Sequence, residues 1–137
     1  MDVDAEIIDA LQVAAEAAVA ASSLPDLPIA YIDVNFDPPN DGKFLELVHI
    51  PNNRENETWG EEKTYQGMFR LILHWPKDGG GTAAPMTALA SISAYFSKSR
   101  ELGALRITNP PNFTGKLDMP SETLYPSSLR YARFQHS

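Results

Sequence analysis

The most regular pattern of apolar and polar residues in this chain lies between residues 64 and 75. Large apolar side chains fall at alternate positions, with one glycine among them: Tyr65, Gly67, Phe69, Leu71, Leu73 and Trp75. This period of two predicts a strand with one face in a hydrophobic core. The positions between them mix polar and apolar residues: Thr64, Gln66, Met68, Arg70, Ile72 and His74. A half-apolar second face of this kind favours contact with another layer or another subunit.

Two segments have the spacing of amphipathic helices. Residues 3–22 are rich in alanine and predict a helix that ends before Pro25, because the residue preceding a proline avoids the helical region. Residues 83–98 predict a second helix, with Thr82 as its N-cap and Pro85 in its first turn. Both helices are expected to pack an apolar side against the sheet.

Four shorter segments predict further strands, at residues 29–35, 44–50, 104–108 and 127–134. Pro126 is expected to lie before the last of them, because proline cannot donate a ladder hydrogen bond. The polar residues 51–63 predict a long hairpin loop that leads into the 64–75 strand. Together these elements predict an α+β fold, with a mainly antiparallel sheet and two helices packed on one face. The length of 137 residues predicts one domain over residues 1–137.

The charge of the chain narrows the classes of function. It has 18 acidic residues against 11 Lys and Arg, a formal net charge of -7, and the basic residues are scattered. Duplex-binding proteins carry a basic patch, so affinity for nucleic acid is not expected, although an acidic channel would let DNA slide without sticking. Without cysteine, disulfides and thiolate metal sites are excluded. No apolar run of membrane-spanning length and no secretory signal is visible, so no membrane contact is expected.

Candidate chemical groups occur singly or in pairs. His49 and His74 end two successive strands, so they would meet across a hairpin, but a metal site needs three or four converging ligands. The glycines at 79–81 precede a helix without the Lys and Ser/Thr of a phosphate-binding loop. The remaining candidates are two pairs of carboxylates in polar segments: Asp37 with Asp41, and Glu61 with Glu62. We therefore predict no catalytic, cofactor-binding or metal-binding residue.

Recognition residues are expected instead on the polar loop and on the second face of the long strand. Trp59 either folds back onto the sheet edge or anchors in a partner's pocket, with Arg54 as its companion, since Trp and Arg are enriched in interface hot spots. The second face of the strand is either solvated or an interface. The candidate assembly interface comprises Arg54, Trp59, Glu61, Glu62, Gln66, Met68 and Arg70.

Five segments spread over nearly the whole chain carry a family resemblance. They are Phe36-Asp37-Pro38-Pro39, Tyr65-Gln66-Gly67, Trp75-Pro76, Ala94-Tyr95-Phe96 and the closing strand around Leu129–Arg133. In this order they resemble the small phage proteins of the tail terminator, or tail completion, class. The shared motifs are structural rather than catalytic.

This resemblance implies a small α/β sandwich that assembles into a homo-oligomeric ring, typically a hexamer. The ring would cap the tail tube, stop its elongation and join it to the head. Its partners would then be the major tail (tube) protein and a head-completion or neck protein, with DNA only as passing cargo. The resemblance also implies a place in the virion, at the head-proximal end of the tail, after assembly in the host cytoplasm. It implies no enzymatic activity and no cofactor.

Two other functions are compatible with the same pattern. A head–tail connector or neck subunit would keep the phage setting but bind the portal side of the head. A small ligand-binding or enzymatic α+β domain would have a pocket beneath the 51–63 loop. The missing acid–base and metal residues make this last interpretation the weakest.

Overall fold

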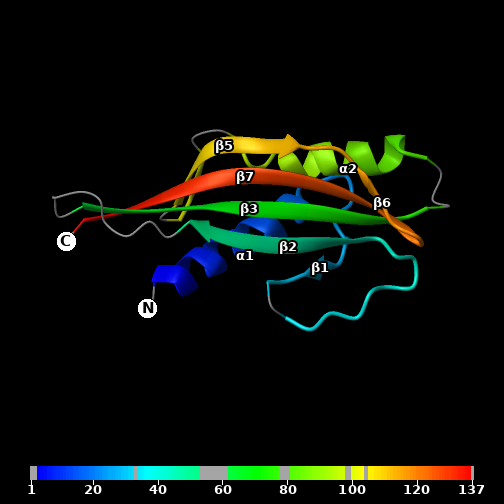
Figure 1. Ribbon diagram of the computed structural model, residues 1–137, viewed down its shortest axis with the longest axis horizontal. Helices are drawn as coiled ribbons and strands as arrows, with labels where there is room; N and C mark the ends of the chain where they lie inside the picture. Colours follow the sequence, from blue (N-terminus) through cyan, green and yellow to red (C-terminus); the bar gives the residue numbers. More distant parts are fainter. Residues whose placement is uncertain are drawn as a thin grey trace.

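The computed structural model describes residues 3–32, 34–52, 62–77, 81–97, 100–103 and 105–136. The elements, drawn in Figure 1, are α1 (Val3–Ala20), β1 (Ile29–Ala30), β2 (Phe44–Asn52), β3 (Glu62–Pro76), α2 (Ala83–Ser93), β4 (Glu101–Leu102), β5 (Leu105–Phe113), β6 (Leu117–Asp118) and β7 (Glu122–His136). Two helices and a sheet in this order confirm the predicted α+β class.

The strands form one mixed sheet with β3 at its centre. β3 pairs antiparallel with β2 on one side and with β7 on the other, and β5 continues the sheet from β7. The short β1 pairs parallel with β2, so the sheet is not purely antiparallel. The predicted 29–35 strand is wrong beyond Ala30, because the chain turns there: the Val34 N–H donates to the Tyr31 carbonyl at 3.3 Å.

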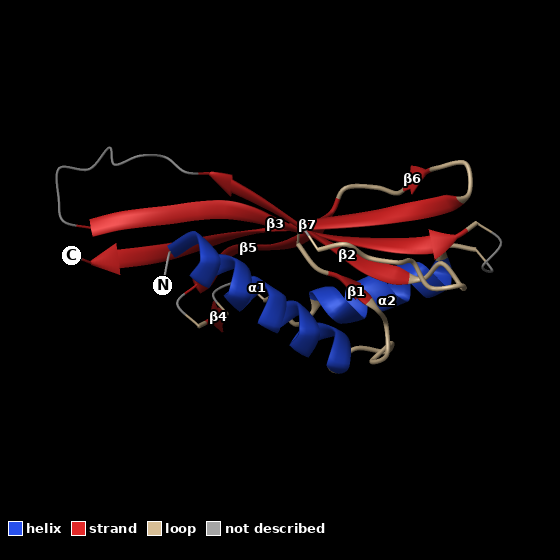
Figure 2. Cartoon of the chain, turned by 90° about the horizontal axis from the view of Figure 1, so that it is seen from below, coloured by secondary structure: helices blue, strands red, loops and turns tan. Residues whose placement is uncertain are grey.

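One hydrophobic cluster joins the helices to the sheet. Phe69, Leu71 and Leu73 of β3 are fully buried in it, which confirms the prediction from their spacing. Leu11 of α1 and Ile92 of α2 belong to the same cluster. Figure 2 shows both helices below the long strands β3 and β7 in that view. Each buried side chain of this size contributes about 1.5–3 kcal/mol, so the alternating pattern strongly specifies which residues of β3 point to the core.

Helix α1 is tied to the far end of the chain by an ion pair. It spans nearly the predicted range of 3–22, and its Glu6 faces Arg133 of β7. The Arg133 Nη2 atom donates to both carboxylate oxygens, at 3.1 and 3.2 Å. The Arg133 side chain is only 14% exposed. The carboxylate of Glu6 supplies the counter-charge that this nearly buried guanidinium group needs.

Helix α2 is shorter than predicted. Thr82 occupies the N-cap position, but its side chain makes no capping hydrogen bond. The helix ends at Ser93 rather than at residue 98, because the Phe96 N–H donates to the Ser93 carbonyl in a tight turn. This turn brings Phe96 into the core, where it is fully buried and its ring centroid lies 6.3 Å from that of Phe69.

Strand β7 runs through Pro126, contrary to the prediction that the last strand begins after it. On one side Pro126 lies opposite Ile72 of β3. On the other side, the pairing with β5 stops at Ser127 and the pairing with β6 starts at Leu124, so no described residue pairs with Pro126 there. A proline is tolerated in a strand where its missing N–H faces no partner.

Candidate assembly interface

The face of the sheet that points away from the core cluster carries three of the predicted interface residues. We call it the outer face, and it comprises Glu46, Val48, Ile50, Gln66, Met68, Arg70, Ile72, Ser128 and Arg130. The strand register sets Met68 between Ile50 and Arg130. It sets Arg70 between Val48 and Ser128 in the same way. Directly opposed residues on one face lie about 5 Å apart, so these side chains form a continuous surface.

A groove of about 420 Å³ opens in the outer face. Its lining includes Ile50, Gln66, Met68, Thr108, Asn109 and Arg130. Ile50 is 43% exposed, Met68 is half-buried and Arg130 is exposed. Methionine and arginine are enriched in the centres of protein interfaces, so this combination favours contact with a partner over a purely solvated face.

The two arginines of the outer face have no acidic partner among the described residues. The Arg70 Nε atom donates to Ser128 Oγ at 3.1 Å, and Nη2 lies 3.9 Å from Met68 Sδ. These contacts orient the guanidinium group without neutralising it. In a chain with a net charge of -7, the outer face thus presents positive charge beside apolar side chains. Such a surface is complementary to carboxylates on a partner.

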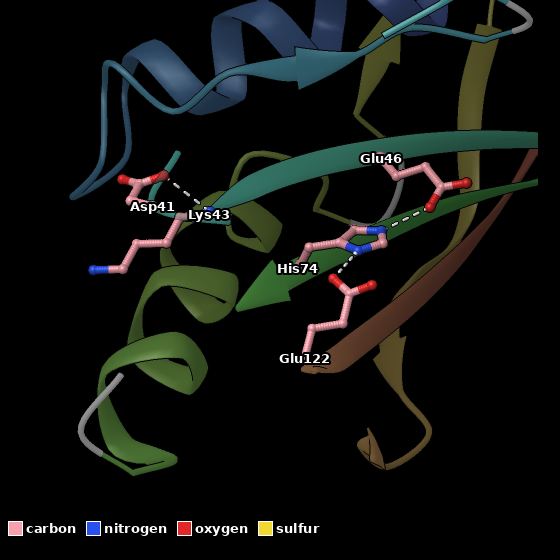
Figure 3. A network of polar contacts seen from close by, with 5 residues as sticks. All are labelled: Asp41, Lys43, Glu46, His74 and Glu122. Atoms are coloured by element: carbon pink, nitrogen blue, oxygen red, sulfur yellow. Dashed lines mark hydrogen bonds and ion pairs between the residues drawn. The ribbon is translucent and has the colours of Figure 1, made fainter. Parts of the chain in front are cut away.

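One end of the outer face is closed by a polar cluster that joins three strands. Figure 3 shows His74 of β3 between Glu46 of β2 and Glu122 of β7. Both ring nitrogens lie 2.7 Å from a carboxylate oxygen, and the residue is only 7% exposed. Both contacts are satisfied when the ring carries two protons, since only then does each nitrogen donate. Phe44 stacks on the ring with centroids 4.0 Å apart.

We expect His74→Leu to lower the free energy of unfolding by about 1.5–3 kcal/mol, the cost of losing hydrogen bonds to charged groups. The substitution also leaves Glu46 and Glu122 facing an apolar side chain with no donor between them. Urea unfolding followed by far-UV circular dichroism measures the loss. Glu46→Gln, which keeps one acceptor, should cost less. Equal stability of His74→Leu and the unsubstituted protein would show that the cluster contributes nothing.

Only part of the predicted interface can be placed. Gln66, Met68 and Arg70 lie together on the outer face, in successive outward positions of β3. Glu62 begins β3 and pairs with His136 along the backbone, but its side chain lies outside the described part. The other three predicted residues, Arg54, Trp59 and Glu61, lie outside the described residues. Both interpretations of Trp59 therefore stay predictions.

The other candidate groups have local structural contacts. His49 and His74 do not meet, because the register pairs His74 with Phe44 at one end of the ladder and His49 with Phe69 further along it. His49 hydrogen-bonds the Tyr131 hydroxyl instead. The Asp41 Oδ1 atom accepts a hydrogen bond from the Lys43 N–H at 3.1 Å, within the turn before β2 (Figure 3). Among the described residues, no group of three or more His, Asp or Glu side chains is arranged to bind a metal.

The sequence did not single out two residues that complete the groove, Ile50 and Arg130. Each lies in a predicted strand, but its place beside Met68 depends on which strands pair and in which register. The alternation within one strand carries no information on its neighbours.

No helix in the described part of the chain is long and apolar enough to cross a membrane.

Comparison with known proteins identifies a family and a shared fold for this chain. Residues 6–131 match the sequence model of a family described as "Phage tail terminator protein". A solved structure without a functional description is 24% identical, with a TM-score of 0.71, covering 94% of this chain and 96% of that chain. A chain of "Virion of native gene transfer agent (GTA) particle" is 15% identical, with a TM-score of 0.63, covering 93% of this chain and 96% of that one. At these identities the two structures show a shared fold. No curated protein matches the chain.

Proposed function

The chain belongs to the phage tail terminator family, and from this premise we propose that it forms a ring that caps the end of the tail tube. The ring stops elongation of the tube and offers a surface for joining to the head. The observation that carries the proposal is the family match over residues 6–131. A structural role in a phage tail follows from the family itself, and the likeness to a virion chain of a gene transfer agent supports it.

The outer face supplies the assembly surface in this proposal. Its half-apolar centre at Met68 and Ile50, with Arg70 and Arg130 beside it, has the composition of an interface rather than of a solvated sheet. In this proposal residues 1–137 form a single domain whose two helices pack on the opposite face, through buried residues such as Leu11 and Ile92, and the outer face is left for a partner. Arg54 and Trp59, which lie outside the described residues, are proposed to take part in the same contact.

The proposed partners follow from a position between the tail tube and the head. A homo-oligomeric ring, with a hexamer as the expected order, binds the major tail protein on one side and a head-completion or neck protein on the other. It occupies the head-proximal end of the tail and assembles in the host cytoplasm. DNA passes through its channel as cargo, and the net charge of -7 disfavours adhesion to the passing phosphates. No catalytic or cofactor-binding role is proposed, because the family is one of structural proteins.

Polymerisation of purified major tail protein tests this function. With the full chain present during growth, we expect shorter tubes of narrow length distribution and a ring at the tube end in negative-stain micrographs. A heat-denatured sample of the same protein is the control. Tubes that elongate unchanged, without end density, would overturn the proposal. Binding to the neck or connector protein but not to tubes would favour the head–tail connector instead.

A further inference from the structure

The solvent side of α1 carries a second surface with the opposite charge. Asp9, Val13 and Glu16 are exposed and lie on the side of the helix opposite to the buried Leu11 and Ala18. Val13 is 57% exposed. The helix thus presents an apolar residue between two carboxylates. We call Asp9, Val13 and Glu16 the α1 stripe.

We propose that, in the ring, the α1 stripe of one copy packs on the outer face of the next copy. The proposal rests on the proposed ring function and names the contact that would build the ring. Asp9 and Glu16 would pair with Arg70 and Arg130, and Val13 would enter the groove beside Met68. Each surface supplies what the other lacks: two carboxylates for two guanidinium groups, and an exposed apolar residue for an apolar groove.

The spacing of the charges agrees on the two surfaces. Asp9 and Glu16 are two helical turns apart, which places their Cα atoms about 10.5 Å from each other along the axis. Arg130 is directly opposite Met68, so Arg70 is its diagonal neighbour across β3 and β7, at about 7–8 Å. The long arginine side chains cover the remaining few ångströms. Val13 lies between Asp9 and Glu16 along α1. When the two carboxylates face the two arginines, Val13 therefore comes close to the groove at Met68 and Arg130.

The position of the two surfaces suits a closed ring. The α1 stripe is exposed on the side of α1 opposite to the buried Leu11 and Ala18, and the outer face lies on the side of the sheet opposite to the core cluster. Figure 2 shows α1 below the long strands β3 and β7. A contact between two different surfaces of one chain is head-to-tail, and such contacts close into rings when the rotation per subunit allows it. The contact would also cover the otherwise bare, half-apolar side of the sheet.

The charged groups around the α1 stripe leave it free for such pairing. No ion pair of Asp9 or Glu16 occurs within the described parts of the chain. Glu16 does lie beside the Tyr31 hydroxyl, whose pKa is raised by burial and further by this carboxylate. A hydroxyl contact orients Glu16 but leaves its negative charge in place. An arginine from a neighbouring copy would supply the missing counter-charge.

Reciprocal charge reversal tests the contact. The helix variant is Asp9→Lys with Glu16→Lys, and the sheet variant is Arg70→Glu with Arg130→Glu. Each alone should weaken self-association at least about tenfold, because two attractive pairs become repulsive. An equimolar mixture should recover assembly, since each variant then offers the surface that the other needs. The matched control is Asp26→Lys with Asp37→Lys, which makes the same change in charge at exposed positions away from α1.

Rings at tube ends in micrographs and self-association in sedimentation velocity are the readouts. If the helix variant and the control assemble like the unsubstituted protein while the sheet variant does not, the α1 contact is wrong, and the proposed ring function survives. If the unsubstituted protein never caps tubes, the proposed function itself fails. If a charge-reversed variant has a lowered Tm, the milder double variant Asp9→Asn with Glu16→Gln replaces it. This double variant should still weaken assembly, and its unchanged assembly would overturn the contact.

Discussion

Gly67→Ala should destabilise the fold by about 3 kcal/mol and lower the Tm by roughly 10 °C, the cost of forcing extra atoms into a packed core. A Cβ atom at this position would lie 2.6 Å from Tyr131 Cζ and 2.9 Å from Cε2, and closer still to the hydroxyl oxygen. Tyr131 is 1% exposed, and its hydroxyl hydrogen-bonds His49. The ring therefore has little freedom to move aside. Gly67 is required because the Tyr131 ring occupies the space of a side chain.

Thermal and urea unfolding monitored by circular dichroism measure this effect. Gln66→Ala, at the neighbouring exposed position of β3, is the matched control and should stay within about 0.5 kcal/mol of the unsubstituted protein. The clash also predicts coupling: Gly67→Ala should cost much less in a Tyr131→Ala background, where the ring is absent. Similar stabilities for Gly67→Ala and Gln66→Ala would contradict the proposed role of the glycine.

Met68→Glu should abolish ring assembly while leaving the fold intact, with self-association weakened about 100-fold. Met68 lies half-buried in the groove between Ile50 and Arg130, so a partner seated there would bury the new carboxylate. Burying a charge in an apolar contact is costly unless it gains a partner within the interface. In the separate subunit, the same carboxylate can pair with Arg130 in solvent, so the stability of the fold should change little.

Capping of tubes and sedimentation velocity report assembly, and circular dichroism reports folding. Ala90→Glu introduces the same carboxylate at an exposed position of α2, the helix whose Leu89 and Ile92 are buried in the core cluster, so this variant should assemble normally. Arg70→Ala should weaken assembly less than Met68→Glu, because it removes an attraction without adding a buried charge. Strong loss of stability in Met68→Glu would identify Met68 as a core residue, and normal rings would remove the outer face from the assembly surface.

Local patterns account for the parts of the fold that were predicted correctly. Residues 64–75 alternate so regularly that their buried set, including Phe69 and Leu73, followed from the sequence alone. The alanine-rich residues 3–22 behaved in the same way, because helix spacing and propensity act over a few residues. Prolines were less informative. Pro126 lies inside β7, since whether a missing N–H matters depends on what stands opposite it.

Pairing between distant strands accounts for the features that the sequence did not reveal. Residues far apart in the chain meet only after β2, β3 and β7 have chosen a register. That register sets Ile50 and Arg130 beside Met68, packs Tyr131 over Gly67 and separates His49 from His74. A shift of one residue would turn every side chain of a strand to the other face. The combined burial of the core residues is what excludes such a shift.

By itself, the sequence determined the α+β class, the central strand with one buried and one mixed face, and the phage tail terminator family. These depend on period, propensity and motifs that can be read along the chain. Only the tertiary structure decided the composition of the outer face, its groove and its two arginines without an acidic partner in the described part of the chain. A surface is made by side chains from several strands, and their neighbours are set by non-local pairing rather than by order in the sequence.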